Sequence, residues 1–469
     1  MTTTEQFEFS AKAKSTILIT LVVGVVLTIL GFFIGGAGHH EEGHGEGHKT
    51  EVAAHEGDHG DGHHAEAAAD HGKDAHAEAA HGEDHAAEGH GAGHGEEKTM
   101  FDRFVVDLWI NNVYFFGLAI VGLLFIAIQY AAQAGWSAGV KRIPLAFVPW
   151  IMVSFALALI LFFAFGHDLF HWTHEGLYAK GTDHYDPILD GKSGFFFFPL
   201  EAGSFPAFFV IRTVLFFGVY ILMFIKIKGL MLKEDLEGGD SYWRKLRKMS
   251  AIFIVFFAVT SPIFAWDNVM SIDPHWFSTM FGWYVFASWF VSGLAAITLV
   301  VSFLKGAGYL KVVNSNHLHD LGKFVFAFSI FWTYIWFSQF LLIYYANIPE
   351  ETIYFVERLS SDQYTPIFFI NLLLNFAFPF LMLMTRDAKR HIIFLKIACV
   401  AVLFGHWIDF YLMITPGTLK GFGSFGLMEI GTIMVFGSAF AFLALTNLAK
   451  HPLVAKNHPM LEESMHHHI

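Results

Sequence analysis

The sequence has a single cysteine, Cys399, and few charged residues. One thiol excludes an internal disulfide, a four-cysteine iron–sulfur cluster and a structural zinc site, so any electron carrier must be haem, a quinone or a cofactor held by a partner. Only 15% of the 469 residues are charged, whereas a soluble domain has about a quarter. Because 54% of the residues are hydrophobic, including 54 Phe, the composition predicts a polytopic membrane protein.

The net charge of −13 belongs to one tract. Residues 39–98 hold 16 acidic residues and 3 Lys, and the rest of the chain holds 26 basic and 26 acidic residues. Between His39 and His94 the tract also carries 14 of the 28 histidines. Imidazole and carboxylate groups bind zinc, copper or nickel, so one interpretation is a weak metal-buffering arm. The other, which the low apolar content favours, is a solvated acidic linker that cannot fold.

Ten apolar runs approach or reach the roughly 20 residues that a helix needs to cross a bilayer. Lipid offers backbone groups no hydrogen bonds, so such runs must be helical, and the sequence predicts an all-α integral membrane protein. The runs are Thr16–Ile34, Phe104–Ala131, Leu145–Gly166, Phe205–Ile225, Ser250–Met270, Phe281–Phe303, Phe324–Ala346, Pro366–Met384, Ile392–Ile414 and Phe425–Leu448.

The distribution of Lys and Arg predicts the orientation. With Lys12 and Lys14 in the cytoplasm, most basic residues of the short loops also fall on the cytoplasmic side. Both termini are then expected inside, and the His-rich tract outside. The small residues 35–38 also fit the end of a signal peptide, but the first run is long enough to span, which favours a membrane helix.

A few ionisable residues lie within or at the ends of these runs. A charge in hydrocarbon is costly, so each is a functional candidate. The predicted orientation places all of them in the outer half of the bilayer, which suits a proton or quinol site that opens outward. Alternatively, Arg212 pairs with Asp409 or Glu429 and only fastens helices. The candidates are Arg212, Asp267, His406, Asp409, Glu429, His167 and Asp168.

His406 and Asp409 stand three residues apart, on one face of a helix. A carboxylate beside an imidazole supports proton relay, although an isolated interior histidine is more often just hydrogen-bonded. Asp267, Asp273 and His275 lie in an aromatic-rich outer turn, residues 266–276. That turn fits an interfacial aromatic belt, a site of proton uptake or exit, or part of a quinone head-group pocket.

The seventh run adds neutral polar groups. Tyr334 and Gln339 either carry hydrogen-bonded water through the apolar region or join neighbouring helices. Glu350 and Glu351 follow at its outer end and form either a proton collector or an ordinary rim. We assign no catalytic residue, cofactor-binding residue or further metal site.

Residues 266–281 and 337–351, with Asn-Ile-Pro-Glu-Glu at 347–351, resemble the NrfD-like family, the membrane subunits of polysulfide reductase and its relatives. More narrowly, the chain resembles the ActF-type subunit of bacterial alternative complex III, a quinol:cytochrome c oxidoreductase. The resemblance covers about residues 100–450. It implies two four-helix bundles with two peripheral helices. The expected parts are 1–38 (first helix), 39–100 (outer loop), 101–270 (first bundle), 271–415 (second bundle) and 416–469 (tenth helix and tail).

The resemblance further implies a bacterial cytoplasmic membrane and a respiratory complex. Partners would be a second NrfD-like subunit, an iron–sulfur protein, c-type cytochromes, membrane lipid and a terminal cytochrome oxidase, but no nucleic acid. Haem c and iron–sulfur clusters belong to those partners, and menaquinone or another quinone is the small molecule expected nearby. The chain itself would provide a scaffold and a proton pathway to the periplasm.

Two other functions remain open. A stand-alone ion or solute transporter would have broken helices and paired repeats, and no matched half-site is evident. A purely structural subunit would use its charges only to fasten helices. A b-type cytochrome needs two axial histidines on facing helices, and only His406 is clearly inside the membrane, so the sequence argues against it.

Overall fold

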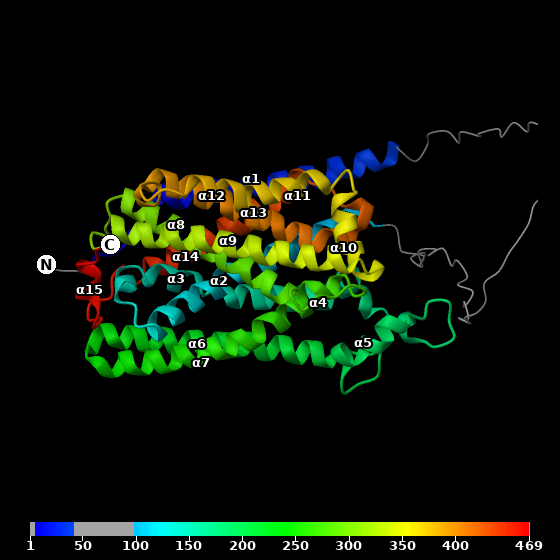
Figure 1. Ribbon diagram of the computed structural model, residues 1–469, viewed down its shortest axis with the longest axis horizontal. Coiled ribbons are helices and arrows are strands. Elements are labelled where there is room, and N and C mark those ends of the chain that lie inside the picture. The colour runs from blue at the N-terminus through cyan, green and yellow to red at the C-terminus, as the bar shows by residue number, and fades with distance from the viewer. Residues whose placement is uncertain (1–4, 42–97, 469) are drawn as a thin grey trace, which may run out of the picture. The chain divides into compact units, whose positions relative to one another are not determined.

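A computed structural model describes residues 5–41 and 98–468, and it is an all-α integral membrane protein (Figure 1). Within these residues, ten helices or helix pairs are long and apolar enough to cross a membrane, and each contains or overlaps one predicted run. They are α1 (Ala11–Glu41), α2 (Met100–Ala131), α3 (Arg142–Phe147) with α4 (Trp150–Leu169), α6 (Ala207–Glu237), α7 (Asp240–Asn268), α8 (Phe281–Gly306), α9 (Ser315–Ala346), α11 (Thr365–Leu372) with α12 (Phe378–Met382), α13 (Ile392–Leu419) and α14 (Leu427–Leu448).

Shorter elements join them. These are α5 (Pro187–Phe197), α10 (Pro349–Leu359), α15 (Leu461–Met465), the 3-10 turns η2 (Gly135–Gly139), η3 (His171–Thr173), η4 (Glu175–Tyr178), η5 (Met270–Ile272), η7 (Ala388–Arg390) and η8 (Lys420–Phe422), and one π-helical turn, η6 (Leu373–Ala377). The His-rich tract from residue 42 on, and the side chains of His39 and His40, lie outside the described residues.

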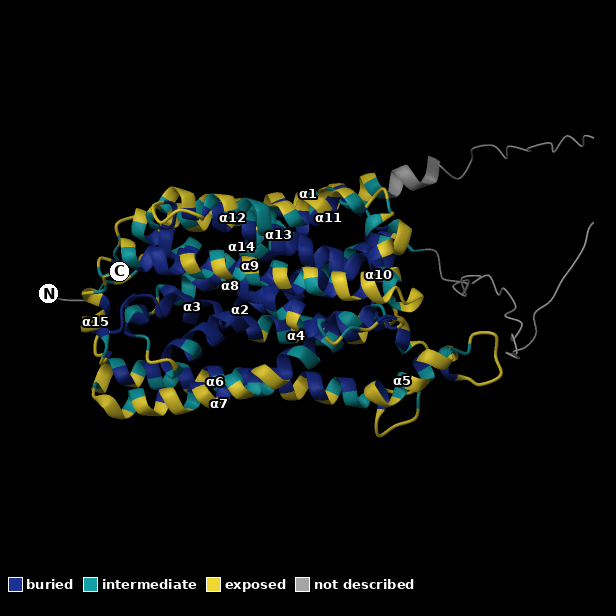
Figure 2. Cartoon of the chain, viewed as in Figure 1, coloured by how far each residue is buried: buried dark blue, intermediate teal, exposed yellow. Residues whose placement is uncertain are grey.

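Helices α2 and α8 form the centre. Of their most apolar windows, 94% and 83% of residues are buried, and Figure 2 shows both as mainly buried ribbon. Helix α2 packs on α4, α7 and α8, and α8 packs on α9 and α13. Residues 5–35 and 98–468 belong to one compact unit, and the predicted boundary at residue 270 within it stays a prediction.

The two segments 167–194 and 346–365, which join membrane-spanning helices, contain helices of their own. Asp186 accepts from the backbone N–H groups of Ile188 and Leu189 and so caps α5, whose first residue is proline. Helix α10 also begins with proline, and Glu350 and Glu351 occupy its first turn, where the helix dipole favours acids. Both helices are only 11 residues long, too short to give an apolar-run signal.

Small residues hold α1 against α14. A Cβ built on Gly431 would lie 2.4 Å from the backbone nitrogen of Thr28 and 2.7 Å from the carbonyl oxygen of Gly24. The two backbones therefore touch, as in other close helix pairs in membranes.

We expect Gly431→Leu to separate α1 from α14. The free energy of unfolding should fall by about 1–3 kcal/mol, the usual effect of overpacking. The measurement is the thermal unfolding midpoint of the purified chain in mild detergent. Gly218→Leu in α6 is the matched control, because its Cβ meets no atom within 4 Å. Equal midpoints for the two variants would contradict the close contact.

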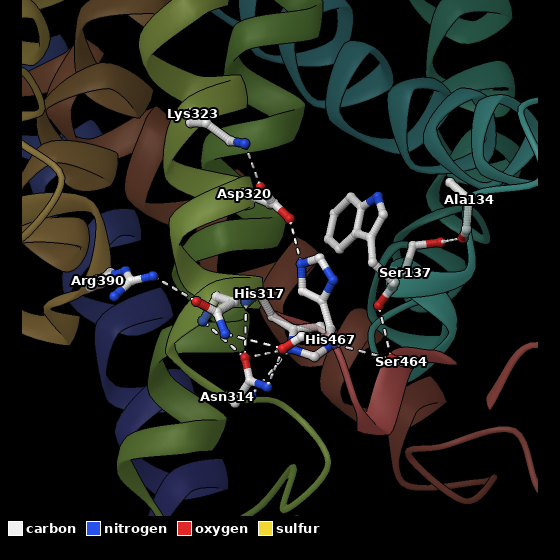
Figure 3. Close-up of polar contacts among 11 residues, drawn as sticks. Ala134, Ser137, Asn314, His317, Asp320, Lys323, Arg390, Ser464 and His467 are labelled. Carbon is white, nitrogen blue, oxygen red and sulfur yellow. Dashed lines mark hydrogen bonds and ion pairs between the residues drawn. The ribbon is translucent and has the colours of Figure 1, made fainter. Parts of the chain in front are cut away.

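The C-terminal segment that contains α15 lies against η2 and the start of α9 (Figure 3). The hydroxyl of Ser464 donates to the carbonyl of Trp136 at 2.8 Å and lies 3.1 Å from Nε2 of His317. His467 reaches Oδ2 of Asp320 with Nε2 at 2.7 Å, and its carbonyl accepts from the Asn314 side chain at 2.9 Å. These contacts tie the tail to η2 and α9.

His458 belongs to the same tail, and its titration makes the docking of the tail depend on pH. Its Nε2 lies 3.0 Å from Nζ of Lys141, and its Nδ1 accepts from the backbone N–H of Met460 at 3.1 Å, so the ring is neutral. Burial, followed by the charges of Lys141 and Arg142, lowers the pKa of His458 to about 3. The docked tail therefore binds a proton less readily than a released tail does, whose histidine titrates near 6.5.

Tail docking is therefore strongest above pH 6.5 and weakens as the pH falls toward 3, by roughly 30-fold at pH 5. The check is hydrogen exchange of the α15 amides at pH 7.5 and pH 5, corrected for the intrinsic rate. His458→Gln should lose this part of the pH dependence while other tail histidines keep theirs. An unchanged pH profile in that variant would refute the assignment.

Candidate functional site

Asp409 of α13 is the centre of a buried polar cluster between α8, α9, α11 and α13. Its Oδ1 accepts from the hydroxyl of Tyr284 and, at 2.9 Å, from the amide of Asn371, and its Oδ2 accepts from Nε1 of Trp332 at 2.9 Å. Asp409 is fully buried. Three donors hold this carboxylate, and among the described residues no Lys or Arg pairs with it.

His406 lies one turn before Asp409 on the same helix. Its Nδ1 is 3.0 Å from the Ser288 hydroxyl and 3.9 Å from Oδ2 of Asp409, too long for a hydrogen bond. Its Nε2 is buried without a partner in the described structure. The predicted pair is thus brought together, but each member is fixed by other helices.

A π-helical turn shapes one wall of the cluster. Asn375, in η6, donates to Oδ1 of Asn371 at 2.6 Å, and Asn371 donates to Asp409. A Cβ on Gly405 would lie 2.3 Å from Oδ1 of Asn375, so the glycine lets the turn reach α13 beside His406. Such turns break the regular helix and occur often at functional sites.

Polar groups continue from Asp409 toward the outer end of the bundle. Tyr354 of α10 is buried, and burial, followed by smaller effects of the charges of Asp409 and Asp273, raises the pKa of its hydroxyl. Its ring stacks on the ring of Trp276 with 4.1 Å between the ring centres. The guanidinium carbon of Arg358 lies 3.4 Å from the centre of the Tyr354 ring. Burial raises the pKa of Tyr354 to about 12, so its hydroxyl stays protonated and can donate and accept hydrogen bonds.

Asp273 ends this series. Burial raises the pKa of its carboxyl above the ordinary value, although Arg358 and His275 oppose the shift. Glu357 lies near it, and burial followed by the charge of Asp273 raises the pKa of Glu357 as well. Two carboxyl groups with elevated pKa values therefore stand at the outer end, where they can exchange protons with water.

The prediction that Arg212 pairs with Asp409 or Glu429 is wrong. Arg212 holds Asp267 in a two-pronged ion pair, Nε to Oδ2 at 2.9 Å and Nη2 to Oδ1 at 2.6 Å. Helix α6 packs on α7 along the chain's own hairpin and not on α13, which is why Asp267 is the partner. Phe195 and Phe208 cover the guanidinium at 4.1 and 4.4 Å from their ring centres.

Glu429 has its own arginine. Arg103 donates to its two carboxylate oxygens at 2.5 and 2.7 Å, and the backbone N–H of Gly426 adds a third bond at 2.7 Å. The sequence did not single out Arg103, because α2 starts at Met100, four residues before the predicted apolar run that begins at Phe104. A capping box of Thr99 and Asp102 extends the helix there. Asp107, one turn on, is buried and its Oδ2 has no partner in the described structure.

Other candidates lie apart from the cluster. Tyr334 is 65% exposed on the outer face of α9, whereas Gln339 is buried with its Oε1 unpaired in the described structure. Glu350 is exposed and Glu351 half-buried at the start of α10. None of these four contacts Asp409 through a hydrogen bond in the described residues.

The outer loop contains the remaining candidates. His275 binds Oδ2 of Asp186 through Nε2 at 2.5 Å, which joins the 266–276 turn to α5. His167 is exposed, and its Nδ1 lies 3.0 Å from the Thr173 hydroxyl. Asp168 is half-buried beside it at the end of α4.

A second group of buried ionisable residues lies away from the Asp409 cluster. At the ends of α2, α3 and α6 that the lysine distribution predicts to be cytoplasmic, Lys141, Arg142 and Glu234 are buried, with 2%, 4% and 1% exposed surface. Tyr130 donates to Glu234 at 3.1 Å, and Arg142 pairs with Asp235. Lys141 also lies 3.0 Å from Nε2 of His458 in the C-terminal tail.

Comparison with known proteins adds no assignment. No known family model matches the chain, and a search of curated proteins finds no similar sequence.

Proposed function

We propose that this chain is a membrane subunit of a quinol-oxidising respiratory complex in the bacterial cytoplasmic membrane, of the alternative complex III type. It serves as scaffold and as a proton route to the periplasm, and it holds no redox cofactor of its own. The observation that supports the route is Asp409, a fully buried carboxylate that accepts from three hydrogen-bond donors and pairs with no arginine or lysine within residues 5–35 and 98–468. A carboxylate kept only as a fastener would be paired with a cation, as Asp267 and Glu429 are.

The proposed proton route includes only some of the ionisable residues that the sequence analysis named as candidates. Asp267 and Glu429 each form an ion pair with an arginine, so we exclude them from the proposed route. Asp409, Tyr284, Tyr354 and Asp273 remain. Tyr284 donates to Asp409, while Tyr354 in α10 and Asp273 after η5 belong to the segments predicted to lie outside. Quinol oxidation in a neighbouring subunit releases protons, which this series accepts and delivers outward.

Isolation of the chain tests membership in a complex. Purified from its native membranes in mild detergent through an affinity tag, it should come out with c-type cytochromes, visible in reduced-minus-oxidised spectra, and with an iron–sulfur protein. Elution of the chain alone would contradict the proposal. A haem signal that stays with the isolated chain would contradict the absence of its own cofactor.

The second candidate is a stand-alone transporter. It is favoured by the π-helical turn η6, which interrupts a membrane-spanning segment beside the buried acid, a feature of many transporters. The chain reconstituted alone into vesicles with a trapped pH dye decides between the two. Proton or solute flux carried by the chain alone would favour the transporter, and tight vesicles favour the complex subunit.

A further inference from the structure

The hairpin of α6 and α7 carries a groove that the proton route does not use. It has a volume of about 510 Å³ and lies between the facing sides of the two helices, near the end at which α6 gives way to α7. The lysine distribution predicts this end to be cytoplasmic. The groove is lined by Ile225, Lys226, Gly229, Leu230 and Lys233 of α6 and by Lys245, Lys248, Met249 and Ile252 of α7.

The lining combines positive charge with apolar surface. Four lysines, two from each helix, stand in it, and no carboxylate does. All four side chains are exposed, and among the described residues none forms an ion pair with an Asp or Glu. Four unpaired ammonium groups around one hollow repel each other unless an anion joins them.

The floor of the groove continues into the lipid-facing surface. Ile225 and Ile252 belong to the lining, and Leu222 and Val255 follow them one turn deeper in the membrane, 57% and 67% exposed. A ligand that fits both parts has an anionic head at the lysines and hydrocarbon tails along α6 and α7. Helices α6 and α7 lie side by side along one edge of the molecule (Figure 1), and only 39% of each apolar window is buried.

We propose that this groove binds an anionic phospholipid of the adjoining leaflet, with its phosphate among Lys226, Lys233, Lys245 and Lys248. Basic pockets between membrane helices bind such head groups. Gly229 opens the floor, because a Cβ on it would meet no atom within 4 Å. The lipid would stabilise the hairpin that supplies Arg212 and Asp267.

The test measures bound lipid by native mass spectrometry of the full chain released from vesicles of phosphatidylcholine alone or mixed with phosphatidylglycerol or cardiolipin. The wild-type chain should retain the anionic lipids and not phosphatidylcholine. Lys226→Gln with Lys248→Gln removes one charge from each wall and should weaken retention roughly 30-fold, the expected loss for two basic groups at an anionic surface. Gly229→Leu should block the groove with no change of charge.

The control pair is Lys311→Gln with Lys456→Gln, which changes the net charge equally at exposed residues outside the groove. It should retain lipid like the wild type. Equal loss in the control would show a general charge effect and overturn the site. So would equal retention of phosphatidylcholine, or unchanged binding in Gly229→Leu. Loss of a protein partner with bound lipid unchanged would make the groove a subunit interface instead.

Discussion

Arg212→Met is expected to be among the most destabilising single substitutions in the chain, costing about 3–5 kcal/mol. It would leave Asp267, whose side chain is 2% exposed, as a buried charge without its partner. The two bonds to the guanidinium at 2.6 and 2.9 Å would be lost, together with its contacts to Phe195 and Phe208. Thermal unfolding in mild detergent and the yield of folded chain measure the effect.

The double variant Arg212→Met with Asp267→Leu separates the cost of an orphaned charge from the value of the pair. Replacing both members of a buried ion pair by apolar residues of similar size is often close to neutral. We therefore expect the double variant to recover most of the stability lost in Arg212→Met. A double variant as unstable as the single one would show that the pair itself stabilises the fold.

The same comparison decides whether Asp267 belongs to the proton route. If the pair only fastens α6 to α7, the double variant keeps the turnover of the assembled complex. If the double variant recovers its stability but its turnover falls, Asp267 belongs to the proton route. Arg103→Met with Glu429→Leu gives an independent copy of the experiment on the α2–α14 pair.

The sequence was sufficient to predict the spans but not the partners of their charges. Hydropathy locates the apolar part of each helix, although α7 already begins at Asp240 and α9 at Ser315, before the predicted runs. His406 and Asp409 share a face because three residues make nearly one turn. Which helix lies opposite depends on packing order and depth, so Arg212 could not be matched to Asp267 by spacing. A stronger signal was the chain's own hairpin, since consecutive antiparallel helices are the commonest neighbours.

Other residues were missed because they carry no charge or lie outside the apolar runs. Tyr284, Trp332 and Asn371 are unremarkable within apolar helices, yet all three donate to Asp409. Their role follows only from four helices meeting at one level. Asp186, by contrast, could have been found from sequence, because an acid directly before proline is a common start of a helix.

Asp409→Asn is expected to lower quinol-dependent turnover of the assembled complex by about 100-fold, the lower range for loss of a positioned acid–base group. An asparagine keeps the size of the side chain but takes up no proton near neutral pH. The NH₂ group of the asparagine also faces at least one of the three side chains that donate to Asp409. The unsatisfied donor should lower the free energy of unfolding by about 1–3 kcal/mol. Haem content per chain must therefore be measured beside the rate, so that loss of assembly is not read as loss of conduction.

Two further variants distinguish a proton carrier from a structural polar group. Asp409→Glu retains a titratable carboxyl and should keep far more activity than Asp409→Asn, although the longer side chain fits the donors less well. Tyr284→Phe removes one of the three donors to Asp409, and should slow turnover with assembly intact. If Asp409 only held α13 to its neighbours, the Asn variant would be the milder change, because it preserves volume and most hydrogen bonds. Wild-type turnover in a fully assembled Asp409→Asn complex would therefore end the case for a proton route through this cluster.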